Sequence, residues 1–351
     1  MNAIRGGKKV QCVFIFDANI LDQLPEEDAR VTFIHDQLSF IDTALKKIGS
    51  SLLVRKGNPV EIWKELLGDP SFSELHVNRD YEPYARERDK QVYEYCEANG
   101  ITYNSYKDQV IFERNEVVKD DGKPYTVYTP YKNKWRSHFS KEMIREAKID
   151  LNPASFVQKQ YALLSLEEIG FKRSEISVEP YTLDIVSEYD LTRNDPAADK
   201  TSYLSVHLRF GTVSIREIIR QTIDVNATFV DELIWREFFM QILFHYPDVV
   251  TNNFRRKYDG IQWRNNEEEF KLWCEGKTGY PMVDAGMRQL NKTGYMHNRV
   301  RMVVASFLCK HLMIDWKWGE AYFAEKLLDY ELSSNNGNWQ WAAGTGCDAS
   351  P

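Results

Sequence analysis

The chain has 351 residues, of which 43% are hydrophobic and 28% charged, a composition typical of a globular protein with room for two domains of ordinary size. Its formal net charge of -7 excludes a generally basic nucleic-acid protein, so any DNA binding must come from a local basic surface. No apolar run could span a membrane, and the start, MNAIRGGKK, has no signal-peptide core, so we expect a cytoplasmic protein.

The cysteines are scattered along the chain, at Cys12, Cys96, Cys274, Cys309 and Cys347. They form no CxxC pair, and no histidine lies at a spacing suited to zinc. We therefore expect reduced thiols and no metal site.

Strand and helix patterns alternate through about residue 106. KVQCVFIFD is a short apolar run typical of a buried parallel strand. A helix is predicted next, with its apolar face formed by Ile34, Leu38, Ile41, Leu45 and Ile48. The following segments are typical of strand, helix, strand, helix and strand: SLLVRKG, VEIWKELL, ELHVNRD, ARERDKQVYEYCEANG and ITYNSY. This alternation predicts a doubly wound parallel sheet in an α/β domain over residues 1–111.

The pattern changes twice after this domain. Residues 112–180 are polar, aromatic and Pro-bearing, as in KDDGKPYTVYTPYKNKW, and we interpret them as a connection between domains. From Tyr181 helical spacing dominates, which predicts a second, all-helical domain over residues 181–351.

The segment TSYLSVHLRFG places hydroxyl groups where a helix start leaves unpaired backbone N–H groups, which suits a bound phosphate. An ordinary helix cap by Thr201 or Ser202 would explain the same residues.

The helix predicted in DELIWREFFMQILFHYP places Glu232, Trp235, Arg236 and Phe239 on one face. Such a face beside a cleft could bind the edge of a nucleic-acid base. The alternative is an exposed Glu232–Arg236 pair of the i,i+4 kind, worth only about 0.2 to 0.5 kcal/mol.

The stretch from Gly294 to Gly346 contains four of the nine tryptophans. Asn298 and Met302 would share one helical face, which suits a flat heterocycle, and two-residue spacing turns Trp339 and Trp341 to opposite sides of a helix. Taken singly, a turn at NNG, a core tryptophan and a gap-filling methionine remain open.

Five segments together resemble the DNA photolyase and cryptochrome family, and most closely its class I photolyases for cyclobutane pyrimidine dimers. They are LIWREFF, EGKTGYPMVDAGMRQLN, MHNRVRM, IDWKWGE and LLDYELSSNNGNWQWAAGTG. The resemblance follows the chain in consistent order over nearly its whole length. It implies an FAD enzyme that repairs such dimers in UV-damaged DNA by light-driven electron transfer.

The resemblance also implies roles for individual residues. Those matching FAD-binding positions are Tyr189, Thr201, Ser202, Tyr203, Leu204, Ser205, Arg301, Asp329, Tyr330, Glu331 and Asn335. Those matching DNA and lesion contacts are Arg193, Glu232, Trp235, Arg236, Phe239, Asn298, Arg299, Met302 and Trp341. Those matching an electron-transfer chain are Trp263, Trp316 and Trp339, and Glu232 and Asn335 match catalytic positions. An antenna chromophore, methenyltetrahydrofolate or a deazaflavin, is compatible with the family, but no residue here assigns it.

Three alternatives share some of these features: a cryptochrome-type photoreceptor, a photolyase for (6-4) photoproducts, and a DNA-binding module without flavin. Histidines generally stand at the Asn298 and Met302 positions in (6-4) photolyases, so we favour cyclobutane dimers and expect a monomer acting on DNA. The chain departs from the family where it lacks a leading WFRRDLRLxDN strand and loop and the last helices, and Glu331 stands where many members have Asp. We therefore expect a family member truncated at both ends.

Overall fold

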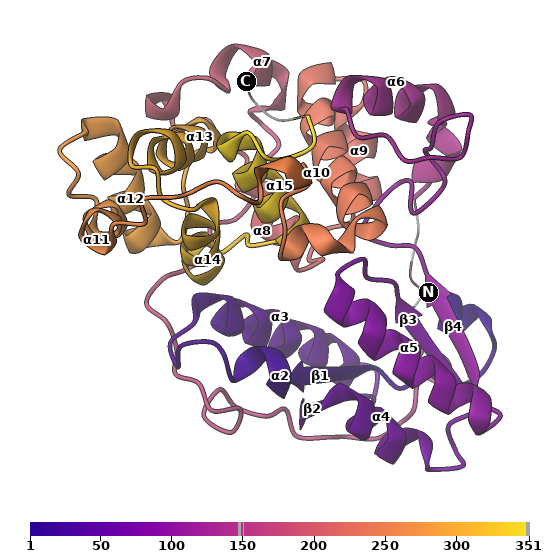
Figure 1. The fold of residues 1–351 in the computed structure, drawn as a ribbon. Helices are drawn as coiled ribbons and strands as arrows, with labels where there is room; N and C mark the ends of the chain where they lie inside the picture. Colours follow the sequence, from indigo (N-terminus) through magenta and orange to yellow (C-terminus); the bar gives the residue numbers. More distant parts are fainter. Residues whose placement is uncertain (147–148, 150, 349–351) are drawn as a thin grey trace. The chain divides into compact units, whose positions relative to one another are not determined.

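The computed structural model describes residues 1–146, 149 and 151–348, which form two compact units (Figure 1). Unit 1 comprises Met1–Asp80, Tyr84–Asp108 and Glu146–Val178, and unit 2 comprises Tyr81–Pro83, Gln109–Arg145 and Glu179–Pro351. Residues 112–180, interpreted above as a connection, are divided between the two units. Within the predicted ranges, positions 147, 148, 150 and 349–351 lie outside the described residues.

Unit 1 contains the parallel strands and the helices that alternate with them. In chain order its elements are α1 (Asn2–Arg5), β1 (Val13–Asp17), α2 (Ala18–Leu21), α3 (Ala29–Lys46), β2 (Leu53–Gly57), α4 (Pro59–Leu67), β3 (Glu74–Asn78), α5 (Pro83–Ala98) and β4 (Thr102–Tyr106). β1 pairs with β2 in parallel, from Val13 opposite Leu53 to Asp17 opposite Gly57. β3 pairs with β4 in parallel as well, and among the described residues the two pairs are not joined into one ladder.

Short polar side chains cap the N-termini of α2, α3 and α4. Asp28 accepts a hydrogen bond from the backbone N–H of Arg30 at 2.8 Å, and Asn58 caps α4 in the same way. The predicted apolar face of α3 is correct for Leu38 and Leu45, which are buried, but Ile41 is 44% exposed. The prediction that Ile41 belongs to the buried face is therefore wrong, because periodicity does not show which positions of a helix other elements cover.

Apart from one isolated β-bridge between Val118 and Pro124, the regular elements among the described residues of unit 2 are helices. Its α-helices are α6 (Tyr128–His138), α7 (Tyr189–Thr192), α8 (Leu204–Arg209), α9 (Ile215–Thr222), α10 (Ala227–His245), α11 (Glu267–Glu275), α12 (Pro281–Thr293), α13 (Asn298–Ser306), α14 (Trp316–Lys326) and α15 (Leu332–Ala343). Phe307–His311 continues α13 as a π-helical turn, and short 3₁₀ turns occur between the other helices.

Two apolar clusters form the core of unit 2. One joins α6, α9 and α10 around Trp135, Ile234 and Phe238, and the other joins α11 to α15 around Trp273 and Trp339. An α/β part followed by an all-helical part confirms the predicted fold class. No helix within the described part of the chain has the length and apolar character needed to cross a membrane.

Candidate functional site

Unit 2 contains a cavity of about 450 Å³ lined by side chains from α7, α8, α10, α13 and α15. A smaller cavity of about 100 Å³ adjoins it and extends toward α14. The residues common to both walls are Asn298, Arg301, Met302, Asp329, Glu331, Ser334, Asn338 and Trp341. The two hollows therefore form one continuous site.

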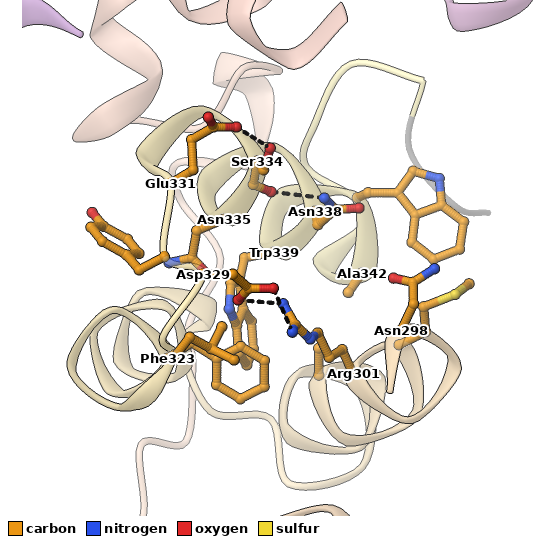
Figure 2. A pocket seen from close by; sticks show the side chains of 15 residues that line it. Asn298, Arg301, Phe323, Asp329, Glu331, Ser334, Asn335, Asn338, Trp339 and Ala342 are labelled. Atoms are coloured by element: carbon orange, nitrogen blue, oxygen red, sulfur yellow. Dashed lines mark hydrogen bonds and ion pairs between the residues drawn. The ribbon is translucent and has the colours of Figure 1, made fainter. Parts of the chain in front are cut away.

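An ion pair between Arg301 and Asp329 lies in the wall shared by the two cavities (Figure 2). The Arg301 guanidinium donates from Nη1 to Asp329 Oδ1 at 3.1 Å and from Nη2 to Oδ2 at 2.9 Å. Its Nε donates to the carbonyl of Met296 at 2.8 Å. Because this bidentate geometry fixes both side chains, it also fixes α13 against the segment that precedes α15.

Glu331 and Glu232 each pair with an arginine from elsewhere in the sequence. Arg236 Nη2 lies 2.9 Å from Glu331 Oε1, and Arg193 Nη2 lies 2.7 Å from Glu232 Oε1. The alternative of an exposed Glu232–Arg236 pair is therefore wrong, because both side chains turn inward to partners on other segments. Burial raises the pKa of Glu232, and the Arg193 guanidinium opposes that shift.

The NNG sequence lies inside α15, so its interpretation as a turn is wrong. A Cβ at Gly337 would collide with the Phe239 ring on α10, and only glycine permits this close helix crossing. The Asn335 amide donates to the carbonyl of Glu320 at 3.0 Å, which fixes its orientation in the wall of the smaller cavity.

The two tryptophans of α15 occupy different environments. Trp339 is 2% exposed in the core between α11, α14 and α15, while Trp341 is partly exposed and lines both cavities. Trp316 is also buried and donates from its indole Nε1 to Asn253 at 2.9 Å, and Trp263 packs half-buried on the same core. Of the three tryptophans predicted to transfer electrons, Trp339 also lines the smaller cavity, while Trp263 and Trp316 line neither cavity.

The segment before α8 presents hydroxyl groups to the larger cavity. Tyr203 adopts a left-handed backbone with φ of 51°, and its side chain makes no capping hydrogen bond to α8. The Thr201 hydroxyl is buried and has no hydrogen-bond partner among the described residues. Ser202 Oγ accepts from the backbone N–H of Leu204 at 3.4 Å, which agrees with the cap interpretation for Ser202. That interpretation leaves Thr201 unexplained, while an anionic ligand would satisfy it.

Comparison with known proteins identifies the family of this site. Residues 229–351 match a family model described as the FAD binding domain of DNA photolyase, and residues 1–149 match one described as DNA photolyase. A deoxyribodipyrimidine photo-lyase from Halobacterium salinarum is 35% identical over 380 residues, which cover 100% of this chain and 79% of the relative. The chain belongs to the DNA photolyase family. The Escherichia coli deoxyribodipyrimidine photo-lyase is 36% identical over 91% of this chain and 72% of its own length.

Solved photolyase structures agree with this assignment. A class III photolyase from Agrobacterium tumefaciens superposes with a TM-score of 0.82 at 32% identity, covering 100% of this chain and 77% of its own. An archaeal photolyase from Sulfolobus tokodaii, solved with two FAD molecules, gives a TM-score of 0.79 at 33% identity over 97% of this chain and 78% of its own.

The chemistry of the cavity wall in this family member fits FAD. The wall contains six lysine or arginine side chains and three carboxylates, an excess of positive charge suited to a diphosphate. The unpartnered Thr201 hydroxyl supplies a donor in the same place. Among the described residues no cluster of histidine, cysteine or acidic side chains could hold a metal ion.

The structure brings most of the predicted site residues to this cavity, leaving Trp263 and Trp316 outside the wall. It also shows wall residues that the sequence analysis missed, including Lys200, Tyr295 and His297. Lys200 directly precedes the hydroxyl segment, and His297 directly precedes Asn298, whose helix it caps by accepting from the Arg299 N–H at 3.2 Å. Their position next to predicted site residues was the one feature of the sequence that could have indicated Lys200 and His297.

Proposed function

We propose that this protein repairs cyclobutane pyrimidine dimers in DNA, using reduced FAD and light. The observation that carries the proposal is a single cavity whose wall holds the hydroxyl segment, the Arg301–Asp329 pair, and the face of α10 from Glu232 to Phe239. When bound, reduced FAD would supply, after absorbing blue light, the electron that opens the cyclobutane ring. The names of the relatives, deoxyribodipyrimidine photo-lyases, support the same reaction.

The residues around the cavity divide into two groups in this proposal. Thr201, Ser202 and Ser205 would hold the diphosphate, because they present hydroxyl donors in a basic wall. Arg301, Asp329 and Asn335 would hold and orient the flavin ring, because hydrogen bonds to other protein groups fix all three side chains in the cavity wall. Trp339, Trp316 and Trp263 would conduct electrons to the flavin from the surface.

The lesion would enter beside α10 and α13. A dimer in a duplex must leave the base stack to reach the cavity, at a cost of a few kcal/mol that is lower for a damaged base. Glu232 can bond a base edge, Trp235 and Trp341 offer flat apolar faces, and Arg193 and Arg299 carry positive charge beside them.

Asn298 and Met302 support cyclobutane dimers over (6-4) photoproducts. Both line the cavity from one face of α13. A carboxamide can bond a pyrimidine edge and a thioether can pack on the cyclobutane ring, but neither exchanges a proton near neutral pH. These side chains suit a reaction that needs an electron and no acid catalyst.

Two measurements test the proposal. The purified protein should bind FAD, and the double variant Thr201→Ala, Ser202→Ala should have a lower ratio of flavin to protein absorbance. An unchanged ratio would refute the proposed diphosphate site. Under blue light the protein should restore thymine absorbance in a dimer-containing oligonucleotide and leave a (6-4) substrate unchanged. Repair of the (6-4) substrate alone would overturn the assignment. We further propose that the protein is cytoplasmic and acts as a monomer. Sedimentation of the purified protein–DNA complex would test whether one protein molecule binds each DNA.

A further inference from the structure

Tyr128 on α6 lies flat against Trp235, one of the aromatic side chains in the cavity wall. The ring centroids are 3.6 Å apart and the ring planes differ by 9°. Phe238 packs edge-on against both rings, at 5.9 Å from Tyr128 and 5.6 Å from Trp235. Tyr128 therefore covers one face of the Trp235 indole. Phe239 also packs on the indole, with centroids 5.5 Å apart and planes 28° apart, and the part of Trp235 left uncovered borders the cavity.

Tyr128 is itself anchored at both ends. Its hydroxyl donates to the carbonyl of Asp231 at 2.7 Å, and its backbone N–H donates to Asp348 Oδ2 at 3.0 Å. Lys132, one turn along α6, pairs with the Asp231 carboxylate at 2.9 Å. Burial raises the pKa of Tyr128, so the hydroxyl stays a neutral donor at working pH.

These anchors, rather than attraction between the rings, account for the arrangement. Aromatic pairs prefer offset or edge-on geometries with centroids about 4.5 to 7 Å apart, and a closely superposed pair is not their preferred state. Asp231 and Trp235 lie four residues apart on α10, so the hydroxyl contact and the ring contact grip one face of that helix. Tyr128 thus sets the position of the Trp235 ring from behind.

We propose that Tyr128 is a positioning residue for lesion binding, which acts by holding the Trp235 ring in the orientation that a flipped-out pyrimidine dimer stacks on. The inference rests on the proposed function, because it takes Trp235 as a lesion contact. Tyr128 is 5% exposed and does not line the cavity, so its effect must pass through Trp235. A ring held in advance loses less rotamer freedom on binding than a free one.

The test compares Tyr128→Leu, Tyr128→Phe and Trp235→Ala in the FAD-loaded protein, kept in the dark so that no repair occurs. Fluorescence anisotropy gives the Kd for a single-stranded oligonucleotide with one thymine dimer and for the undamaged oligonucleotide, and their ratio is the damage selectivity. Tyr128→Leu should lower this selectivity about 2- to 10-fold, the range expected for one aromatic pair. Tyr128→Phe keeps the ring but removes the hydroxyl anchor to the Asp231 carbonyl, so it should lower selectivity by less than Tyr128→Leu does.

Two further variants separate positioning from general damage to the fold. Phe139→Leu removes a ring stacked on Trp135 at 5.0 Å in the same core, away from the cavity, and should leave selectivity unchanged. In a Trp235→Ala background, Tyr128→Leu should have no further effect on selectivity. If Tyr128→Leu cannot be purified, Tyr128→Met carries the same expectation, since its unbranched side chain fills irregular space.

The outcomes distinguish this inference from the proposed function. A parent protein without damage selectivity, or an unaffected Trp235→Ala variant, would overturn the lesion-binding role of the cavity and the inference with it. Selectivity lost in Trp235→Ala but intact in Tyr128→Leu would overturn the inference alone. A further loss of damage selectivity on adding Tyr128→Leu to the Trp235→Ala variant would also overturn the inference, because Tyr128 would then affect selectivity without acting through Trp235.

Discussion

Removing one partner of the Arg301–Asp329 pair should destabilise unit 2 far more than removing both. Asp329→Leu removes the carboxylate partner of the Arg301 guanidinium, which keeps its hydrogen bond to the Met296 carbonyl. The side chains are 24% and 5% exposed, so the charge left behind is largely screened from water. Breaking a buried pair costs about 3 to 5 kcal/mol, and the partial exposure of Arg301 places our expectation near about 3 kcal/mol.

The double variant Arg301→Met, Asp329→Leu should recover most of the lost stability, because two apolar side chains then replace the pair and no unpaired charge is left buried. Urea unfolding followed by tryptophan fluorescence measures the free energies, since every tryptophan except Trp63 belongs to unit 2. Glu275→Gln is the matched control. It breaks an exposed pair with Lys277, 66% and 37% exposed, and should change stability by less than about 1 kcal/mol.

Two results would refute this reasoning. A loss below about 1 kcal/mol in Asp329→Leu would mean that water reaches the pair freely, as it does for surface pairs. A double variant as unstable as the sum of the single variants would mean that the charges do not interact in the folded state.

Three further predictions concern the acids and aromatic groups of unit 2. Burial raises the pKa of Glu237 to about 7 from an ordinary value of 4.5, so the stability it contributes is present below pH 4.5 and lost as pH rises to about 7. Urea titrations should show the parent's stability relative to Glu237→Gln falling by up to roughly 3 kcal/mol between pH 4.5 and 7; a rising or flat difference would contradict the shift. Trp339→Phe should slow the loss of oxidised-flavin absorbance under blue light with an external thiol as the electron source, and an unchanged rate would mean that the first electron donor is another residue. Glu232→Ala should slow dimer repair about 10- to 100-fold, as expected for the loss of a hydrogen bond to a charged group, and Met302→Ala should also slow repair. A variant that repairs dimers at the parent's rate would show that its residue does not contact the lesion.

Local pattern was sufficient to predict the elements of this fold. Apolar runs with alternating helical spacing located β1 to β4 and α3 to α5, because strands and helices bury one repeating set of side chains. The same reasoning was wrong for Ile41, whose exposure depends on what the rest of the unit covers. The turn at NNG, which local sequence left open, is wrong, since Gly337 is required by the Phe239 ring on another helix and not by a backbone bend.

The candidate site was predictable as a set of residues but not as a set of contacts. The resemblance to the family supplied the positions, and the structure shows that most of them line one cavity. Pairing between Arg236 and Glu331, or between Arg193 and Glu232, could not be predicted, because each joins segments far apart in the sequence. Tyr128 lay in the predicted connection, and nothing in its local sequence relates it to Trp235.

The net charge of -7, which argues against DNA binding when the chain is taken as a whole, does not describe the cavity. The cavity wall contains the basic residues Arg193, Lys200, Arg209, Arg236, Arg299 and Arg301 and the acidic residues Glu232, Asp329 and Glu331. Each of these acids already pairs with one of these arginines, so ligand binding need not leave a carboxylate unbalanced. Lys200 and Arg209 pair at 3.2 and 3.1 Å with Glu188 and Glu82, which do not line the cavity, so acids outside the wall balance these two charges. Arg299 differs from the other wall cations, because its contacts among the described residues are the neutral side chains of Asn194 and Met302. Its charge is the one available to the ligands of the proposed reaction, a dinucleotide and a DNA strand, both of which are polyanions.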